Sequence, residues 1–453
     1  MLPFAPPLIG DEEIDAVVDT LRSGWLTTGP KTRQFEAEFA AAVQAPAALA
    51  VNSCTAALHL ALLTAGIAPG DEVITSCWTF AATVNVIEHV GATPVVVDVD
   101  PESLNLDLER VAAAITPRTR AIIPVHFAGR PVDREWLATV ARKHNLLVIE
   151  DAAHAIGASH NGTSIGGGGS ITAFSFYATK NLVTGEGGML TGPPDFVERA
   201  RVASLHGLSR EAWNRYRTSG AWRYDVTCAG FKYNMTDIQA ALGLAQLRRF
   251  NVMQQQRRRI VAAYNAAFSQ FPELITPGDA ADACHAWHLY VLRLRPGALT
   301  IGRDEFIDEL TARRIGTSVH FIPIPCHSHY QRTYGWRIDD FPIAREQFAG
   351  VVSLPLSAAI TDEDAADVIE AVQPAKARVA APVADYEPSV EQFDGEAVGA
   401  VEALLGHSPV PVDEIIRLSG APSGAVQMAL LELDLAGRLD RHAGGKVSLR
   451  VAT

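Results

Sequence analysis

The chain has 453 residues, of which 48% are hydrophobic and 20% charged, as is typical of a globular protein with two or three packed units. Its formal net charge of -13 argues against a whole-protein role on nucleic acids or anionic membranes. No stretch reaches the roughly 18 apolar residues of a membrane helix, and the start lacks the basic segment of a signal peptide. Five scattered cysteines without a CxxC pair favour reduced thiols in a cytoplasm, and argue against structural zinc or a disulfide framework.

Helical and strand patterns alternate between about residues 50 and 190. Helices are predicted over 55–66 and 132–144, and short runs rich in Val and Ile predict strands within 71–80, 91–100, 119–129 and 145–158. This alternation indicates βαβ units and a mostly parallel sheet with helices on both faces. In such sheets, functional residues gather beyond the carboxyl ends of the strands.

Two residues beyond these strand ends attract attention as a pair. Lys180 follows an aromatic, strand-like run and precedes a glycine-rich turn, and an amine held among apolar groups loses hydration and becomes a usable nucleophile. Asp151 follows the apolar run LLVIE, where an unpaired carboxylate would be costly. An amine and a carboxylate facing each other match pyridoxal phosphate, which needs a Schiff-base lysine and a counter-charge for its pyridine nitrogen.

A phosphate site is predicted at the start of the first helix, in NSCTAALHLAL. Ser53, Cys54 and Thr55 stand where a helix N-terminus offers unpaired N–H groups and a positive dipole end. A plain N-cap is the other interpretation of the same residues, and the two can hold together.

The sequence resembles the DegT/DnrJ/EryC1/StrS family of sugar aminotransferases, which have the fold type I architecture of pyridoxal-phosphate enzymes. The likeness covers roughly residues 3 to 375, with motifs in the expected order. It is carried by PFAPPLIGDEEIDAVVDTLRSGWLTTGP, CTAALHLAL, ITSCWTFAATVNVI, VIEDAAHAIGA, FSFYATKNLVTGEGGML, FKYNMTDIQAALGLAQL, HAWHLYVLRL and LPLSAAIT.

The resemblance implies roles for matching residues. Lys180 would form the Schiff base and move the proton at the substrate carbon, Asp151 would pair with the pyridine nitrogen, and His154 would lie near the ring oxygen. Cys54, Thr55 and Ser175 would hold the phosphate. Phe80 would stack on the ring, with Trp78 the second choice because alternate strand residues face opposite sides. No metal is implied.

Family members often read G-x-N-Y-R-M where this chain has Gly230-Phe231-Lys232-Tyr233-Asn234-Met235. The resemblance implies that either Lys232 or Asn234 reaches the phosphate of a neighbouring subunit, and so predicts at least a homodimer. The K-Y-N and EDAAHA forms resemble enzymes that aminate UDP-linked 4-keto sugars, with glutamate as the expected donor.

The remaining histidines, at positions 126, 206, 288, 320, 327 and 329, are each interpreted first as core or surface residues. His320, in SVHFIPIP, is the best candidate for a substrate contact because family members place a substrate-facing loop there.

Four segments are predicted. They are a large α/β cofactor-binding domain with an N-terminal arm over 1–250, a small α+β domain over 251–376, a linker over 377–392, and a winged-helix-like domain over 393–453. The long helix that opens the second segment should carry Arg257, Arg258 and Arg259 on a solvated face.

The C-terminal segment is similar to the C-terminal domain of DprA/Smf-type proteins. It shows three helical patterns and a hairpin with Gly444 and Gly445 at its turn. The expected recognition helix, 423–435, contains Glu432 and Asp434 and no Lys or Arg, and the segment has eight acids and five bases. DNA binding depends on neutralising phosphates, so a protein-contact or stability module is favoured. Val426, Leu430 and Leu433 should be core, whereas Met428, Leu431 and Leu435 would widen the apolar arc into a docking surface.

Three functions follow from these features. The first is a pyridoxal-phosphate aminotransferase acting on a nucleotide-linked keto sugar. The second is a regulator that keeps the cofactor fold and reads DNA with the winged helix, and the charge of the tail argues against it. The third is a dehydratase with the same cofactor, which would have His in place of Lys180.

Overall fold

The computed structural model describes residues 1–208, 224–278, 282–376 and parts of 401–450. They fall into two compact units, Met1–Pro382 and Val383–Thr453. The predicted linker 377–392 lies outside the described residues. No helix in the described part of the chain is long and apolar enough to cross a membrane.

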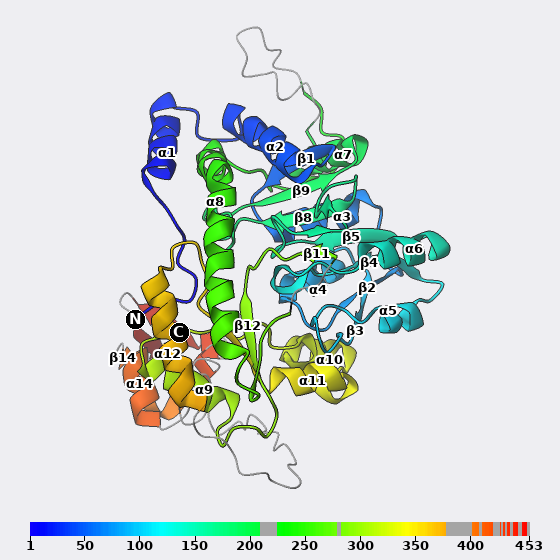
Figure 1. The fold of residues 1–453 in the computed structure, drawn as a ribbon. Helices are drawn as coiled ribbons and strands as arrows, with labels where there is room; N and C mark the ends of the chain where they lie inside the picture. The colour runs from blue at the N-terminus through cyan, green and yellow to red at the C-terminus, as the bar shows by residue number, and fades with distance from the viewer. Residues whose placement is uncertain are drawn as a thin grey trace. The chain divides into compact units, whose positions relative to one another are not determined.

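A seven-stranded sheet forms the centre of the first unit, in the order β1-β9-β8-β5-β4-β2-β3 (Figure 1). Its strands are β1 Ala47–Val51, β2 Glu72–Ser76, β3 Thr93–Val97, β4 Thr119–Ile123, β5 Leu147–Asp151, β8 Ile171–Ser175 and β9 Gly188–Gly192. Strand β9 is antiparallel to both neighbours, and the pairs from β8 to β3 are parallel. The prediction of a mostly parallel sheet is confirmed.

Helices cover both faces of this sheet, as predicted. The helices around it are α1 Asp11–Ser23, α2 Pro30–Val43, α3 Cys54–Thr64, α4 Ala81–His89, α5 Leu108–Ala114, α6 Arg134–His144, α7 Pro194–Ser204 and α8 Asp237–Phe268. Residues of α3, α4 and α7 share one hydrophobic cluster with Ile123 and Ile149, whereas residues of α2 and α8 pack with Phe174 and Met189. Successive strand residues therefore face opposite helical layers.

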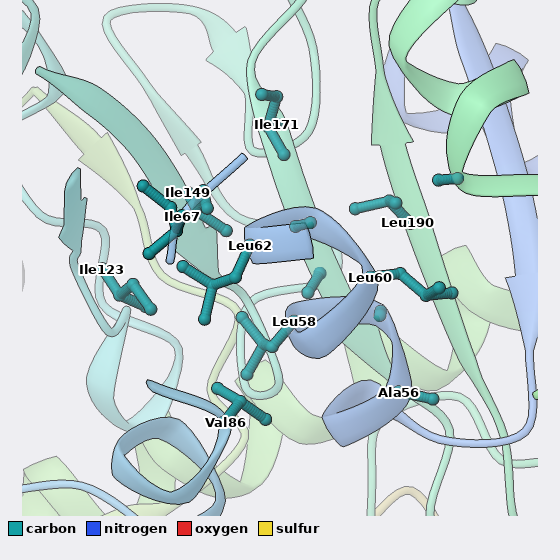
Figure 2. Close-up of a cluster of buried hydrophobic side chains, with 14 of the residues drawn as sticks. Ala56, Leu58, Leu60, Leu62, Ile67, Val86, Ile123, Ile149, Ile171 and Leu190 are labelled. Carbon is teal, nitrogen blue, oxygen red and sulfur yellow. The ribbon is translucent and has the colours of Figure 1, made fainter. Parts of the chain in front are cut away.

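Helix α3 is buried almost all round, which explains its continuous apolar sequence. Leu58, Leu60 and Leu62 are at most 1% exposed and contact strand residues such as Ile149 and Leu190 (Figure 2). A helix with no polar face needs a fully enclosed position, so its N-terminus is fixed against the sheet.

The N-terminal arm is tied to the start of α8 by one buried carboxylate. Asp237, 1% exposed, accepts hydrogen bonds from the backbone N–H of Gly29 at 2.7 Å and of Thr32 at 2.9 Å. It also accepts from the N–H of Lys31 at 3.0 Å and from the Thr32 hydroxyl at 2.6 Å. Asp237 thus satisfies the unpaired N–H groups at the start of α2.

A smaller sheet, β10-β12-β13, packs with the second half of α8. Its strands are β10 Leu274–Ile275, β12 Tyr290–Leu294 and β13 Val351–Leu354, and its helices include α9 Arg303–Ala312 and α12 Asp362–Lys376. Helices α10 Ser328–Tyr334 and α11 Pro342–Phe348 lie between α9 and α12 in sequence, as do the 3-10 turns Ile324–Cys326 and Ile338–Asp340. A further 3-10 turn, Phe127–Gly129, follows β4 of the large sheet. A third sheet joins β11 Ala283–Cys284, β6 Ser159–His160 and β7 Thr163–Ser164.

One expectation about α8 is wrong. Arg258 and Arg259 are exposed, but Arg257 is 3% exposed and donates from Nη1 to the carbonyl of Leu356 at 3.0 Å. Burial lowers its pKa to about 10. Three consecutive helical residues span about 200° of the helix, so one of them can face inward. The carbonyls of Trp287 and Leu356 both accept from Arg257 Nη1, whereas its buried Nε has no hydrogen-bond partner among the described residues.

The second unit has its own small core. It contains α14 Val412–Ser419 and the sheet β14-β16-β15, with β14 Val410–Pro411, β15 Leu439–His442 and β16 Lys446–Leu449. Val426, Leu430 and Leu433 are at most 2% exposed, which confirms their predicted place in the core. Met428, Leu431, Leu435 and the Gly444–Gly445 turn lie outside the residues that the structure describes.

Candidate active site

The predicted residues come together because three strands end at one edge of the large sheet. Asp151 ends β5 and Ser175 ends β8, while Val51 ends β1 just before α3. Gly188 of β9 pairs with both Ser175 and Val51. A Cβ on Gly188 would lie 2.6 Å from the Cys54 nitrogen, so only glycine allows the first turn of α3 to approach this edge.

Asp151 is 5% exposed and is held by two donors. Its Oδ2 accepts from the Thr83 hydroxyl at 2.8 Å, and its Oδ1 accepts from the backbone N–H of Ala153 at 3.1 Å. Burial raises the pKa of Asp151, although both hydrogen bonds and the nearby Lys180 act in the opposite direction. Asp151 is therefore held in one orientation, but its neighbours offset its negative charge only in part.

Lys180 lies in the loop between β8 and β9, in a turn closed by its N–H donating to the Tyr177 carbonyl at 2.9 Å. Burial lowers its pKa to about 8, against the opposing effects of Cys54 and Asp151. With this pKa roughly a tenth of the amine is unprotonated at pH 7, far more than for an ordinary lysine, as a nucleophile or base requires.

His154 is 6% exposed, and its Nδ1 is 3.2 Å from the Ala128 backbone N–H, which can only donate. Burial, followed by the charge of Lys180, lowers the His154 pKa well below its usual value. The neutral ring consequently carries its proton on Nε2. Its ring stacks on Phe321 at 5.7 Å and lies 4.3 Å from the ring of His288.

The start of α3 combines an N-cap with free helix N–H groups, the two interpretations that the sequence allowed. The Ser53 side chain accepts from the Ala56 N–H at 3.1 Å, as an N-cap does. Cys54 and Thr55 are the first two helical residues, whose N–H groups point out of the helix end. Burial raises the pKa of the Cys54 thiol, so it is neutral. Ser175 is 9% exposed at the end of β8.

Phe80 is exposed over 64% of its surface, whereas Trp78 is fully buried. The reason given from sequence was wrong, because β2 ends at Ser76 and neither residue belongs to a strand. Phe80 instead occupies the N-cap position of α4, and Trp78 packs against Phe127 in the core. Trp78 is thereby removed from the site.

Lys232 and Asn234 lie beside the segment that leads into α3. Asn234 pairs with Val51, its Nδ2 donates to the Thr28 hydroxyl at 2.6 Å, and the Lys232 ammonium donates to its Oδ1 at 2.5 Å. Lys232 is exposed, and its carbonyl accepts from Asn52 Nδ2 at 3.4 Å.

His320 lies in the loop before the 3-10 turn Ile324–Cys326. Its Nδ1 is 2.9 Å from the Ser353 hydroxyl, and its ring stacks on Phe4 of the N-terminal arm at 5.4 Å. Burial and then the charge of Lys180 lower its pKa to about 4, so the ring is neutral.

Sequence reasoning gave no site role to three neighbours of the predicted residues, although His288 was among the histidines weighed above. Thr83 holds Asp151, and Asn181 and His288 adjoin Lys180. The only sequence signal was indirect, since Asn181 follows Lys180 and His288 stands in the family-like segment HAWHLY.

A sequence model of the DegT/DnrJ/EryC1/StrS aminotransferase family matches residues 7–373, and one of the DprA winged helix domain matches residues 394–445. The chain is 53% identical over 374 residues to the spore coat polysaccharide biosynthesis protein SpsC of Bacillus subtilis, covering 82% of this chain and 96% of that protein.

Solved structures agree with this likeness. A putative sugar aminotransferase, Spr1654 from Streptococcus pneumoniae, in its PMP-form, is 35% identical with a TM-score of 0.79, covering 83% of this chain and 99% of its own. DesV of S. venezuelae, in complex with a ketimine intermediate, is 35% identical with a TM-score of 0.74 over the same shares. The fold is thus that of the pyridoxal-phosphate sugar aminotransferases.

The cofactor of this chain is pyridoxal 5′-phosphate, since the family match is joined by a PLP-form among the similar structures. The residues present fit it. The edge of the sheet offers an amine of lowered pKa, a buried carboxylate in need of a cationic partner, and a helix N-terminus that Gly188 admits.

Proposed function

The chain belongs to the DegT/DnrJ/EryC1/StrS aminotransferase family, and we propose that it transfers the amino group of L-glutamate to the keto carbon of a UDP-linked 4-keto sugar. The observation that carries the proposal is that the Lys180 amine and the buried Asp151 carboxylate lie beyond the same edge of the sheet, close enough for each to shift the pKa of the other. The names of the similar proteins, which refer to polysaccharide biosynthesis and sugar aminotransferases, support the sugar as acceptor.

Bound pyridoxal phosphate supplies an electron sink for the substrate carbon and carries the amino group between donor and acceptor. Asp151, held by Thr83 and by the N–H of Ala153, keeps the proton on the ring nitrogen. Lys180 would hold the cofactor and, with its amine free, would move the proton at the substrate carbon, because its lowered pKa allows it to act as both acid and base near neutral pH.

The other predicted residues hold the cofactor in place. His154 carries its proton on Nε2 and so can donate it to the oxygen substituent of the ring. The N–H groups of Cys54 and Thr55, with the hydroxyls of Thr55 and Ser175, bind the phosphate. Phe80 has a large exposed face with which to stack on the ring.

His320 is proposed to contact the substrate as a neutral hydrogen-bonding group. Its Nδ1 is engaged with Ser353, which leaves Nε2 for a ligand. The stacking of Phe4 on this ring gives the N-terminal arm a part in shaping the acceptor site.

A panel of UDP-, GDP- and dTDP-linked keto sugars, each assayed with glutamate and with other amino donors, tests the substrate proposal. Turnover confined to UDP-4-keto sugars with glutamate is expected, and a clear preference for another nucleotide would refute that part. Lys180→Ala should abolish turnover, while Lys143→Ala on the exposed side of α6 should not. Reduction with borohydride should fix the cofactor on the peptide that contains Lys180.

We further propose that the active form is a homodimer, in which Lys232 or Asn234 serves the phosphate of the neighbouring subunit. An inactive Lys180→Ala chain mixed with a chain altered at both Lys232 and Asn234 should regain activity, because one site then contains every intact group. No recovery in mixed dimers would contradict a cross-subunit contact.

The five free cysteines support a reducing, cytoplasmic setting.

A further inference from the structure

A row of buried polar side chains runs from Lys180 into the protein. The Lys180 Nζ lies 3.4 Å from Nε2 of His288, and Nδ1 of His288 lies 3.1 Å from Oδ1 of Asn181. Asn181 Nδ2 donates to the Ala286 carbonyl at 2.7 Å and to Gln254 Oε1 at 3.2 Å. His288, Asn181 and Gln254 are each at most 5% exposed, and they come from three segments: the approach to β12, the loop after β8, and α8.

One backbone carbonyl sets the direction of every hydrogen bond in this row. The carbonyl of Ala286 can only accept, and it receives both Asn181 Nδ2 and, at 2.6 Å, Gln254 Nε2. Both amide groups are therefore oriented without ambiguity. The oxygen of Asn181 must face His288, and since this oxygen only accepts, Nδ1 of His288 must carry the proton.

A neutral imidazole with its proton on Nδ1 has a lone pair on Nε2. That atom is the one that faces Lys180. Burial, with the charges of His154 and Lys180 acting next, lowers the pKa of His288 well below its usual value, which agrees with a neutral ring. His288 is consequently an acceptor aimed at the lysine amine.

Other titratable groups surround this pair from each packed element. They are Cys54 of α3, Asp151 of β5, His154 after β5, Arg257 of α8 and His320. Among the described residues, His288 is the side chain within hydrogen-bond distance of the Lys180 amine. The Asp151 carboxylate acts on Lys180 through its charge, whereas His288 acts on the direction of its N–H groups.

We propose that His288 is a positioning residue for Lys180, and that Asn181 and Gln254 hold it in the tautomer that accepts a hydrogen bond from the amine. With one N–H directed at His288, the amine cannot rotate freely about its Cε–Nζ bond, and its lone pair is kept pointing away from His288. When Lys180 takes up a proton, the same acceptor stabilises the ammonium. This inference rests on the proposed role of Lys180.

The test measures the proton affinity of Lys180 in the cofactor-free full chain. Competitive acetylation with acetic anhydride between pH 6 and 10, read by mass spectrometry of the Lys180 peptide, gives the midpoint of its titration. His288→Leu should lower that midpoint by about one pH unit, because a hydrogen bond to a charged group is worth roughly a tenfold change. In the loaded enzyme, kcat should fall about tenfold with the KM for the donor nearly unchanged.

His285→Leu is the matched control. His285 is also buried, at 6% exposure, and is three residues from His288, but its Nδ1 accepts from the Trp287 N–H at 2.8 Å and its ring stacks on Trp287. Its replacement should leave the Lys180 midpoint unchanged. His288→Gln, whose side-chain oxygen can accept, should restore part of the midpoint and of kcat.

An unchanged Lys180 midpoint in folded His288→Leu overturns the proposal. If that variant does not fold, Asn181→Leu decides, because it keeps His288 but removes the acceptor that fixes its tautomer; a wild-type midpoint there also overturns it. Borohydride trapping distinguishes an unchanged midpoint from a failure of the proposed function. Cofactor fixed on a lysine other than Lys180 would refute the role of Lys180 itself.

Discussion

Replacing Lys180 by Met should stabilise the cofactor-free protein at neutral pH. Burial lowers the pKa of Lys180 from 10.5 to about 8, so the unfolded chain binds this proton more tightly than the folded one. The cost to folding is complete below about pH 8 and disappears as the pH rises toward 10.5. The stability of the wild type should therefore rise with pH in that window through this group.

The size of the effect follows from the shift of the Lys180 pKa from 10.5 to about 8. At 1.36 kcal/mol for each tenfold change in proton affinity, the cost is about 3 kcal/mol at pH 7 and under about 1 kcal/mol at pH 10. Lys180 keeps some contact with solvent, which makes these upper values. Met retains most of the packing of the lysine stem, so the pH-dependent difference between the two proteins isolates the charge.

Urea unfolding of both cofactor-free proteins at pH 7 and pH 10, followed by tryptophan fluorescence, measures this difference. All seven tryptophans precede residue 337, so the signal reports the first unit alone. Lys143→Met, in an exposed position of α6, is the control and should show no such pH dependence. A stability difference between Lys180→Met and wild type that is equal at the two pH values would refute the reasoning.

Further expectations concern other groups described above. Asp151→Asn should still bind the cofactor but transaminate far more slowly, and near-normal turnover would contradict its pairing with the ring nitrogen. Thr83→Val removes a hydroxyl bound to Asp151, and kcat should fall about tenfold while the protein stays folded, as circular dichroism can check. Asp237→Ala leaves the start of α2 unsatisfied, and urea unfolding should show a loss of roughly 3 kcal/mol; a loss below about 1 kcal/mol would show that water replaces the carboxylate. A chain that ends near residue 380 should keep the cofactor and activity, and tight, salt-sensitive binding of random duplex DNA by the full chain would revive the regulator hypothesis.

The sheet and the positions of Lys180 and Asp151 were predictable because they depend on local patterns. Strands rich in Val and Ile, followed by polar residues, place those residues at one edge whatever the details of packing. The core positions Val426 and Leu430 likewise follow from helical spacing alone.

The misses depend on contacts between distant segments. Arg257 can face inward because the carbonyls of Trp287 and Leu356 accept hydrogen bonds from its Nη1. These residues are distant in sequence, so no local pattern predicts the contacts. The strand before Phe80 ends earlier than its apolar sequence indicates, because Ser76 caps the turn by accepting from the Trp78 N–H at 3.0 Å. The tautomer of His288 depends on an amide whose orientation is set by the Ala286 carbonyl.

Helix α8 runs unbroken for 32 residues, about 48 Å, from the large sheet to the smaller sheet of the first unit (Figure 1). Asp237 at its start fastens the N-terminal arm, Gln254 in its middle supports Asn181, and Phe268 at its end lies in the core with the smaller sheet. One inserted residue would turn everything beyond it by about 100° and shift it by about 1.5 Å. An insertion or deletion between Asp237 and Gln254 would therefore break either the anchoring of the N-terminal arm or the support of Asn181, whereas a substitution on the exposed side of α8 would leave both in place.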